Sequence, residues 1–280
     1  ISAHITKKVA DKLVDMFIKD RAEFEKKWDD ISVFVKYGII SDEKFSEKAK
    51  EFALLKNTEG KYFTLKEYEE KVKPNQTDKD KNVVYLYTSD ANKQHSFIEI
   101  AKNRAYDVLV LDGVLDSHFI NHLEQKLEKT QLRRVDSDTI DKLIAKDEKA
   151  ASILSKEEEE SVKKIFESAI NNKAMTLAVE SLSPDDLPVT ITMSEWMRRM
   201  KDMARTGGGG GFGFMGAMPD SYNVAINGNH ALVQKILKAE TEEHKTKLAK
   251  QVYDLALLSQ NMLTGADLTA FVKRSVELVG

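Results

Sequence analysis

The amino-acid sequence predicts a mixed α+β and α/β fold in three successive parts: a helical segment, a small three-layer α/β unit, and an α+β domain that ends in a helical hairpin. Strand-like runs at 83–87, 106–111 and 131–135 alternate with helical segments, and this order predicts a parallel sheet. Residues 136–156 are polar and charged, which indicates a domain boundary. Two apolar stripes with helical spacing near the end of the chain predict the hairpin.

The composition is that of ordinary globular protein with more than one domain. The chain has 280 residues, of which 41% are hydrophobic and 32% charged, enough for two cores. We expect a first domain at residues 1–148, with a helical section to about residue 75 and the α/β unit from about residue 76. A second domain is expected at residues 149–280.

Charge and cysteine content argue against several partners and sites. The net charge of −3 comes from interspersed acids and bases, so nucleic acid is not an expected partner. Without cysteine the chain has no disulfide, thiol nucleophile or thiolate metal site, which is typical of a reducing compartment. No apolar run approaches ~18 residues, so we expect a cytoplasmic protein without a membrane partner. Since helical pattern begins almost at Ile1, we also expect a longer parent protein.

The first section is predicted to be mostly helical. Apolar residues recur with helical spacing over residues 9–35, and Gly38 is expected to end this run. A further helix is expected over residues 42–55. Thr64 and Glu67 then form a capping-box pattern, which predicts the start of a short helix.

The α/β unit offers few candidates for catalysis or metal binding. His118 and His122 stand one helical turn apart, but no third ligand accompanies them, and we interpret them as part of a solvated helix face. Asp90 and Asp112 follow the first two strands of the unit, where enzymes with a parallel sheet place their sites. An α/β enzyme is therefore one alternative function, although lone aspartates in such positions are usually helix caps.

The second domain is predicted to be α+β. Ser155 precedes a run of glutamates, which favours a helix start because carboxylates stabilise the positive end of the helix dipole. Residues 176–181, 188–192 and 222–226 have the composition of strands. Periodicity leaves open whether the stripes of the terminal hairpin are buried in its own domain or pair with a second copy in a four-helix bundle.

The segment from Met193 to Met218 carries the strongest functional signal, because it holds six of the nine methionines. Its first part forms a helix whose apolar face consists of Met193, Trp196, Met197, Met200 and Met203. Methionine is unbranched and polarizable, and it suits a surface that adapts to many partners. Five successive glycines then lead to four further apolar residues, Phe212, Phe214, Met215 and Met218. The pattern favours a binding surface; the alternative is a purely structural dimerisation module in which the methionine face is buried as core.

Four strings in order resemble the ninety-kilodalton heat-shock chaperone family, specifically its bacterial HtpG type. They are FEKKWDDISVFVKYG (24–38), YEEKVKPNQTDKDKNVVYLY (68–87), YDVLVLDGVLDSHFINHL (106–123) and NGNHALVQKIL (227–237). The resemblance runs nearly end to end, from the later part of the family's middle domain through its C-terminal dimerisation domain. One departure is the turn at 227–230, where this chain has Asn-Gly-Asn-His and the family commonly has Asn-Pro-x-His.

The resemblance implies an ATP-driven dimeric chaperone, of which this chain is the part without the ATPase domain. ATP and magnesium would bind in a domain upstream of Ile1, so this chain is expected to hold no cofactor or metal and to hydrolyse no ATP. The implied partners are unfolded or partly folded client proteins and a second copy of the chain.

The resemblance also implies two sets of site residues. For clients it points to the methionine helix and to the exposed face of the helix that begins at His118, and the pattern of the adjoining loop adds its apolar residues. The implied client-binding residues are Trp196, Met197, Met200, Met203, Phe212, Phe214, Met215, Met218, His118, Phe119 and Asn121. The implied dimer interface consists of Val252, Leu255, Leu258, Met262, Leu268, Phe271, Val272, Ser275 and Val279.

Overall fold

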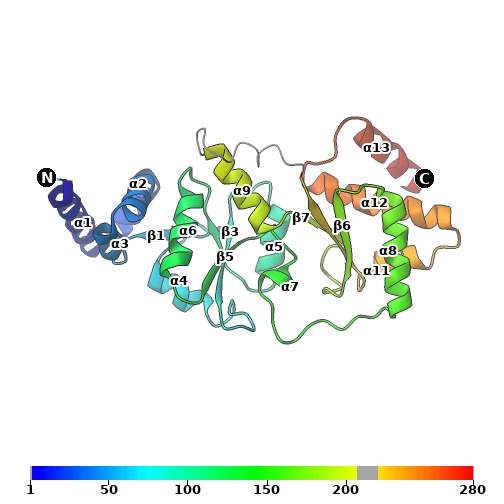
Figure 1. The fold of residues 1–280 in the computed structure, drawn as a ribbon, viewed down its shortest axis with the longest axis horizontal. Helices are drawn as coiled ribbons and strands as arrows, with labels where there is room; N and C mark the ends of the chain where they lie inside the picture. Colours follow the sequence, from blue (N-terminus) through cyan, green and yellow to red (C-terminus); the bar gives the residue numbers. More distant parts are fainter. Residues whose placement is uncertain (1, 207–219, 280) are drawn as a thin grey trace.

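The two ends of the chain lie at opposite ends of an elongated molecule, with the α/β unit between them (Figure 1). The computed structural model describes residues 2–206 and 220–279, with the side chains of residues 6–201 and 220–279. The mixed α+β and α/β class predicted from the sequence is confirmed. None of the helices in the described part of the chain has the length and apolar composition needed to cross a bilayer.

The N-terminal section consists of three helices, α1 (Ser2–Lys19), α2 (Arg21–Ser41) and α3 (Glu43–Ala49). Aromatic side chains hold them together. The ring of Phe24 meets those of Phe17 and Phe52 edge to face, with centroids 5.5 and 6.3 Å apart. Trp28 is buried beside Phe24.

Two predicted boundaries in this section are wrong. Gly38 lies inside α2, which continues to Ser41. Glycine is needed here because the ring of Phe45 on α3 packs against the helix, and a Cβ at Gly38 would lie 2.7 Å from that ring. The helix predicted over 42–55 ends at Ala49, and residues Leu54–Lys56 form a strand. The apolar run before this strand is buried, and periodicity alone does not separate a short buried strand from a helix.

A short antiparallel hairpin joins this section to the α/β unit. It pairs β1 (Leu54–Lys56) with β2 (Tyr62–Thr64), and α4 (Leu65–Val72) follows directly. The capping box predicted at Thr64 and Glu67 is confirmed, since each side chain accepts the other residue's backbone N–H.

The α/β unit has a three-stranded parallel sheet in the order β4-β3-β5. Its elements are β3 (Val83–Thr88), α5 (His95–Asn103), β4 (Val108–Val110), α6 (Asp116–Lys126), β5 (Thr130–Arg134) and the short α7 (Ile140–Leu143). Alternate residues of β3 enter different cores: Tyr85 packs in the cluster that includes α6, and Leu86 in the cluster that includes α5 and α7. The predicted three layers follow from this alternation.

The C-terminal domain is built on a mixed sheet in the order β6-β8-β7. Its elements are α8 (Lys156–Ile170), β6 (Met175–Glu180), β7 (Val189–Thr192), α9 (Glu195–Thr206), β8 (Tyr222–Asn227), α11 (Ala231–Leu237), α12 (Glu242–Ser259) and α13 (Gly265–Val279). Helices α8, α11 and α12 share one apolar core with strands β7 and β8. The predicted helix start at Ser155 is confirmed as a capping box with Glu158.

The turn at 227–230 holds the domain to its linker without a proline. The buried Asn229 amide donates to the carbonyls of Ala151 and Leu182, and its oxygen accepts the N–H of Ile153. His230 caps α11 through its Nδ1 atom, which accepts the N–H of Leu232. Side-chain hydrogen bonds therefore fix this turn.

Candidate functional site

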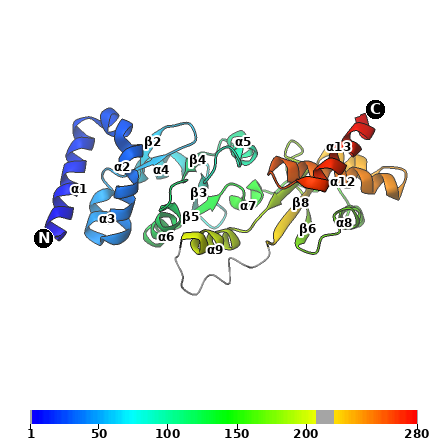
Figure 2. The ribbon, with the colours of Figure 1, turned by 90° about the horizontal axis from the view of Figure 1, so that it is seen from above.

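Helix α9 connects the two halves of the molecule. It begins just after β7 of the C-terminal sheet, and Ser194 Oγ accepts the N–H of Met197 in its first turn, 3.3 Å away. From there α9 lies beside α6 of the α/β unit (Figure 2). Helix α9 therefore follows a strand of the C-terminal domain in sequence but packs against the α/β unit.

The polar face of α9 is the face that docks. Glu195 Oε1 accepts the hydroxyl of the buried Tyr87 at 2.8 Å and Arg199 Nε at 2.9 Å. Its other carboxylate oxygen accepts the backbone N–H of Arg134 at 3.2 Å. A single carboxylate thus ties the start of α9 to two strands of the parallel sheet.

Two arginines extend this attachment. Arg199 donates to Glu124 on α6 at 2.6 Å and to the carbonyl of Leu132 on β5 at 2.9 Å. Arg198 is only 6% exposed and donates to Asp136, 2.9 Å away. Asp136 is also paired with Arg134, at 2.7 Å. The three α9 side chains therefore meet partners from α6, β3, β5 and the segment after β5.

Burial shapes the ionisation of this network. It raises the pKa of the Asp136 carboxyl above its usual 3.8, although Arg134 acts in the opposite direction. Burial also raises the pKa of Tyr87, and the nearby charge of Glu195 adds to this effect. Burial opposes the charge of Arg199, but the hydrogen bond and charge of Glu124 and those of Glu195 outweigh it, so the pKa of Arg199 is raised. Burial and the opposite charges of neighbouring side chains therefore act against each other on Asp136 and Arg199.

The apolar face of α9 points away from this attachment. Trp196 is 59% exposed, and Met197 and Met200 are partly exposed. Neither methionine belongs to the apolar clusters formed by the described side chains. The Met203 side chain and the predicted loop residues Phe212, Phe214, Met215 and Met218 lie outside the described residues.

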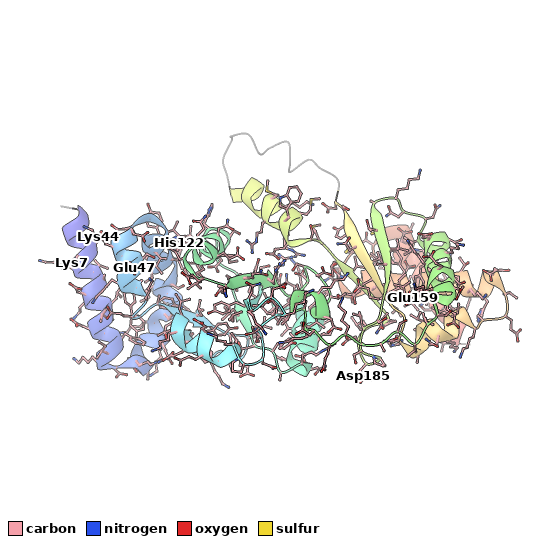
Figure 3. All side chains as sticks on the ribbon, turned by 60° about the horizontal axis from the view of Figure 1, so that its bottom comes forward. Lys7, Lys44, Glu47, His122, Glu159 and Asp185 are labelled. Atoms are coloured by element: carbon pink, nitrogen blue, oxygen red, sulfur yellow. The ribbon has the colours of Figure 1, made fainter. Side chains whose placement is uncertain are left out.

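The candidates on α6 have different surroundings. His118 is exposed and Asn121 is partly buried, with its side-chain oxygen 3.3 Å from Arg199. Phe119 is 3% exposed and packs in the core under α2, so its assignment to an exposed face is wrong. His122 is partly exposed and lies against α3 (Figure 3), where its Nε2 is 3.1 Å from Ser46 Oγ.

The aspartates of the alternative enzyme site have different surroundings. Asp90 accepts the N–H groups of Asn92 and Lys93, which makes it the cap of the turn before α5. Asp112 lines a cavity of about 180 Å³ at the carboxyl ends of the strands, beside Arg134. Among the described residues, no group of three or more His, Asp or Glu side chains has the arrangement of a metal site.

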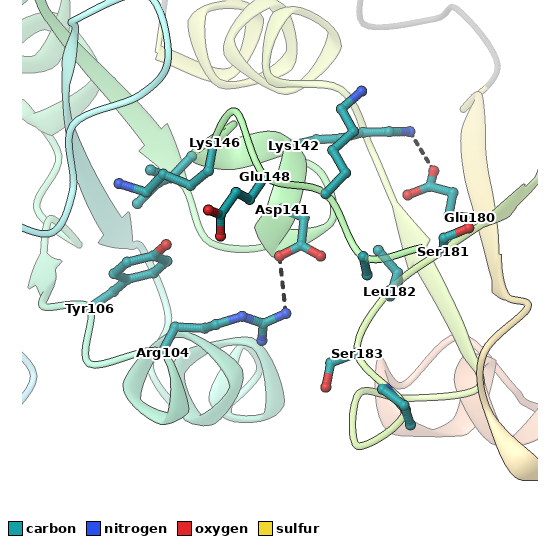
Figure 4. A pocket seen from close by; sticks show the side chains of 14 residues that line it. Arg104, Tyr106, Asp141, Lys142, Lys146, Glu148, Glu180, Ser181, Leu182 and Ser183 are labelled. Atoms are coloured by element: carbon teal, nitrogen blue, oxygen red, sulfur yellow. Dashed lines mark hydrogen bonds and ion pairs between the residues drawn. The ribbon is translucent and has the colours of Figure 1, made fainter. Parts of the chain in front are cut away.

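A larger cleft of about 650 Å³ separates the α/β unit from the C-terminal domain (Figure 4). Arg104 on its wall pairs with Asp141 at 3.0 Å and with Asp186 of the C-terminal domain at 2.9 Å. Lys142 pairs with Glu180 across the same cleft. Ion pairs thus span the cleft between the two halves here.

The terminal hairpin exposes a second apolar surface. Of the residues predicted for a dimer interface, Leu255, Leu258, Val272 and Val279 are exposed, and Met262, Leu268 and Ser275 are partly exposed. Val252 and Phe271 are buried inside the chain, so their assignment to an outer surface is wrong. Val276 and Leu278 are exposed on the same helix and were not predicted. For Val276 a signal was available, since it follows Val272 by four residues, about one helical turn.

The sequence comparison decides the family. A model of the Hsp90 protein family matches residues 1–279. The chain belongs to the Hsp90 family. The resemblance inferred from the four strings is therefore confirmed, and the elements described above are those of an Hsp90 chain.

Two curated relatives of this Hsp90 chain carry the name HtpG. Chaperone protein htpG of Bacteroides fragilis is 37% identical over 346 residues, covering 100% of this chain and 50% of that protein. Chaperone protein HtpG of Porphyromonas gingivalis is 46% identical over 253 residues, covering 89% of this chain and 37% of that protein. The chain spans about half the length, or less, of the curated relatives it matches.

Proposed function

We propose that this chain is the client-binding and dimerising part of an ATP-driven chaperone of the HtpG type. The orientation of α9 is the observation that carries the proposal. An amphipathic helix normally buries its apolar face, but α9 turns Glu195, Arg198 and Arg199 toward the α/β unit and leaves Trp196 59% exposed. An exposed face of this composition suits partners that vary in shape.

The clients would be unfolded or partly folded polypeptides, which expose the apolar side chains that this face accepts. Burial of apolar surface contributes roughly 25 cal/mol per Å² before the costs of ordering the client. A face built on Trp196, Met197 and Met200 therefore supports weak and reversible binding. Two such faces in a dimer would strengthen binding through avidity.

The dimer would form through α12 and α13. Leu255 and Leu258 on α12 and Val272 and Val276 on α13 are exposed aliphatic residues, which are costly to leave in water. A second copy would cover them in a four-helix bundle. ATP binding and hydrolysis would belong to the longer parent protein, and we expect no ATPase activity from this chain.

A double substitution of the apolar face tests the client proposal. Met197→Ser with Met200→Ser removes apolar surface without touching the polar attachment, and we expect about tenfold weaker suppression of a heat-aggregating test enzyme, followed by light scattering. Val9→Ser is the matched control, because Val9 is also exposed but lies on α1.

The same variants separate the proposal from the structural alternative. If the two methionines are core, their replacement lowers the thermal midpoint of unfolding by several degrees and affects aggregation only through lost structure. Full suppression by the folded double variant would rule out this face as the client site.

A further inference from the structure

The polar residues of α9 form a network with a feature that client binding does not require. Glu195, Arg198 and Arg199 are spaced three and four residues apart, so they lie on one side of the helix. Their main partners are Tyr87, Asp136 and Glu124, all from the α/β unit. The sequence signal for this face, a stripe of mixed charge, is usually that of a solvated helix surface.

The hydrogen bonds and ion pairs of this network fix the orientation of α9 more than they stabilise the fold. Glu195 uses both carboxylate oxygens, and Arg199 donates to a carboxylate and to a backbone carbonyl. Such paired contacts restrict rotation of the helix about its axis. Buried ion pairs of this kind add little net stability, because the cost of removing charges from water offsets their attraction. Loss of one partner is costly, since the other charge stays buried.

The position of α9 in the chain makes these contacts a link between the two halves. Thr192 ends β7 in the C-terminal sheet, and α9 starts at Glu195, so little chain separates that sheet from the docked helix. Arg198 contacts both sides, since it donates to Asp136 and also to the carbonyl of Met193. A movement of one half against the other must therefore break this network or carry α9 along.

We propose that Glu195, Arg198 and Arg199 are positioning residues that hold α9 with its apolar face outward and couple this face to the relative position of the two halves. This inference rests on the proposed client-binding role of α9. The polar network, termed the α9 clamp, consists of these three residues and their partners Tyr87, Glu124 and Asp136. While the clamp is closed, Trp196 is exposed and Met197 and Met200 are partly exposed.

Amide hydrogen exchange of the 280-residue chain tests the clamp without any client. Arg199→Gln and Glu195→Gln each remove a charge from the network, and we expect the amides of α9 to exchange about tenfold faster, while those of β3 and α8 keep their rates. Arg199→Lys keeps the charge but loses the paired geometry, and we expect an intermediate rate. Arg133→Gln is the matched control, because Arg133 lies on β5 and its side chain donates to Gln131 rather than to a residue of α9.

A second readout keeps the test valid if Arg199→Gln fails to fold. Trp28 is buried and Trp196 is exposed, so acrylamide quenching of tryptophan fluorescence reports mainly on α9. In Glu195→Gln we expect lower fluorescence anisotropy of the quenchable component. Unchanged α9 exchange and unchanged anisotropy in the folded variants would overturn the clamp.

Failure of the clamp and failure of the client proposal are distinguishable. The clamp is judged from exchange and anisotropy in the absence of client, whereas the client site is judged from suppression by the Met197→Ser and Met200→Ser variant. If both proposals hold, Arg199→Gln also weakens suppression several-fold although every apolar residue of the face is intact. Faster α9 exchange with full suppression would overturn the coupling of the clamp to client presentation.

Discussion

Helices α9 and α13 are both amphipathic, but they are attached to the molecule in opposite ways. Helix α9 is held by ion pairs on its polar side and turns Trp196 outward. On helix α13 the side chain of Phe271 is buried against the rest of the molecule, whereas Val272 and Val276 are exposed on the outer side of the helix. Each helix leaves apolar surface uncovered, so exposure alone does not say what either surface is for.

The composition of the two exposed faces distinguishes them. Methionine and tryptophan on α9 give a large, adaptable contact area, which suits partners of many shapes. Valine and leucine on α12 and α13 have few rotamers and pack in one arrangement, which suits a single permanent partner. The difference teaches that side-chain flexibility, rather than apolar area, separates the proposed client face from the proposed dimer face.

The largest expected effect tests the permanent character of the α13 face. Val272→Asp together with Val276→Asp would place charges inside the proposed four-helix bundle, and we expect the dimer to dissociate about a hundredfold more readily or worse. Sedimentation equilibrium at micromolar concentration measures this. Ala270→Asp is the control, because Ala270 is exposed and lies on the side of α13 away from the two valines. If the unsubstituted 280-residue chain is already monomeric under these conditions, the assignment of the α13 face to a dimer is wrong.

An intermediate effect separates the inner and outer sides of the two helices. Phe271→Ala empties a buried site and should lower the free energy of unfolding by about 3 kcal/mol. Met200→Ala alters a partly exposed side chain outside the apolar clusters and should change it by less than ~1 kcal/mol. Urea unfolding followed by circular dichroism compares the two. Equal losses would mean that Met200 is core and that the two helices do not differ.

Much of the fold could be predicted from local patterns. The capping boxes at Thr64 and Ser155 and the alternating strands and helices of the α/β unit depend on neighbours in sequence, which are visible without a structure. The β1–β2 hairpin was missed because three-residue strands carry too little periodicity. Gly38 was misplaced because its role depends on Phe45 of another helix.

The candidate site was less predictable, for a physical reason. A helical wheel gives the two faces of α9 and of α13 but does not say which face meets the rest of the molecule. The inward contacts of Glu195 and Arg199 depend on Tyr87 and Glu124, which are 108 and 75 residues away in sequence. Phe119 and Phe271 were assigned to outer surfaces for the same reason. Phe119 is covered by residues distant in sequence, and α13, which carries Phe271, packs on α12 of its own hairpin.

The smallest expected effect concerns acid, and it has opposite signs at the two helices. Near α9, burial raises the pKa of Asp136 above 3.8, with Arg134, Arg198 and Glu195 as its charged neighbours. The folded state then binds a proton more tightly than the unfolded state, so this group adds stability as the pH falls through the folded pKa toward 3.8.

At α13 the hydrogen bond from Lys247 lowers the pKa of Glu277 below 4.5. That pair contributes above pH 4.5 and its contribution is lost as the pH falls through the folded pKa. As the pH falls from about 4.5 toward 3.8 we therefore expect exchange protection, corrected for intrinsic rates, to persist or rise slightly in α9 and to fall in the last turn of α13. Asp136→Asn is the control that removes the first trend. Equal loss of protection in both helices would show that the α9 ion pairs respond to acid as exposed pairs do. The proposed difference in how α9 and α13 are attached would then be wrong.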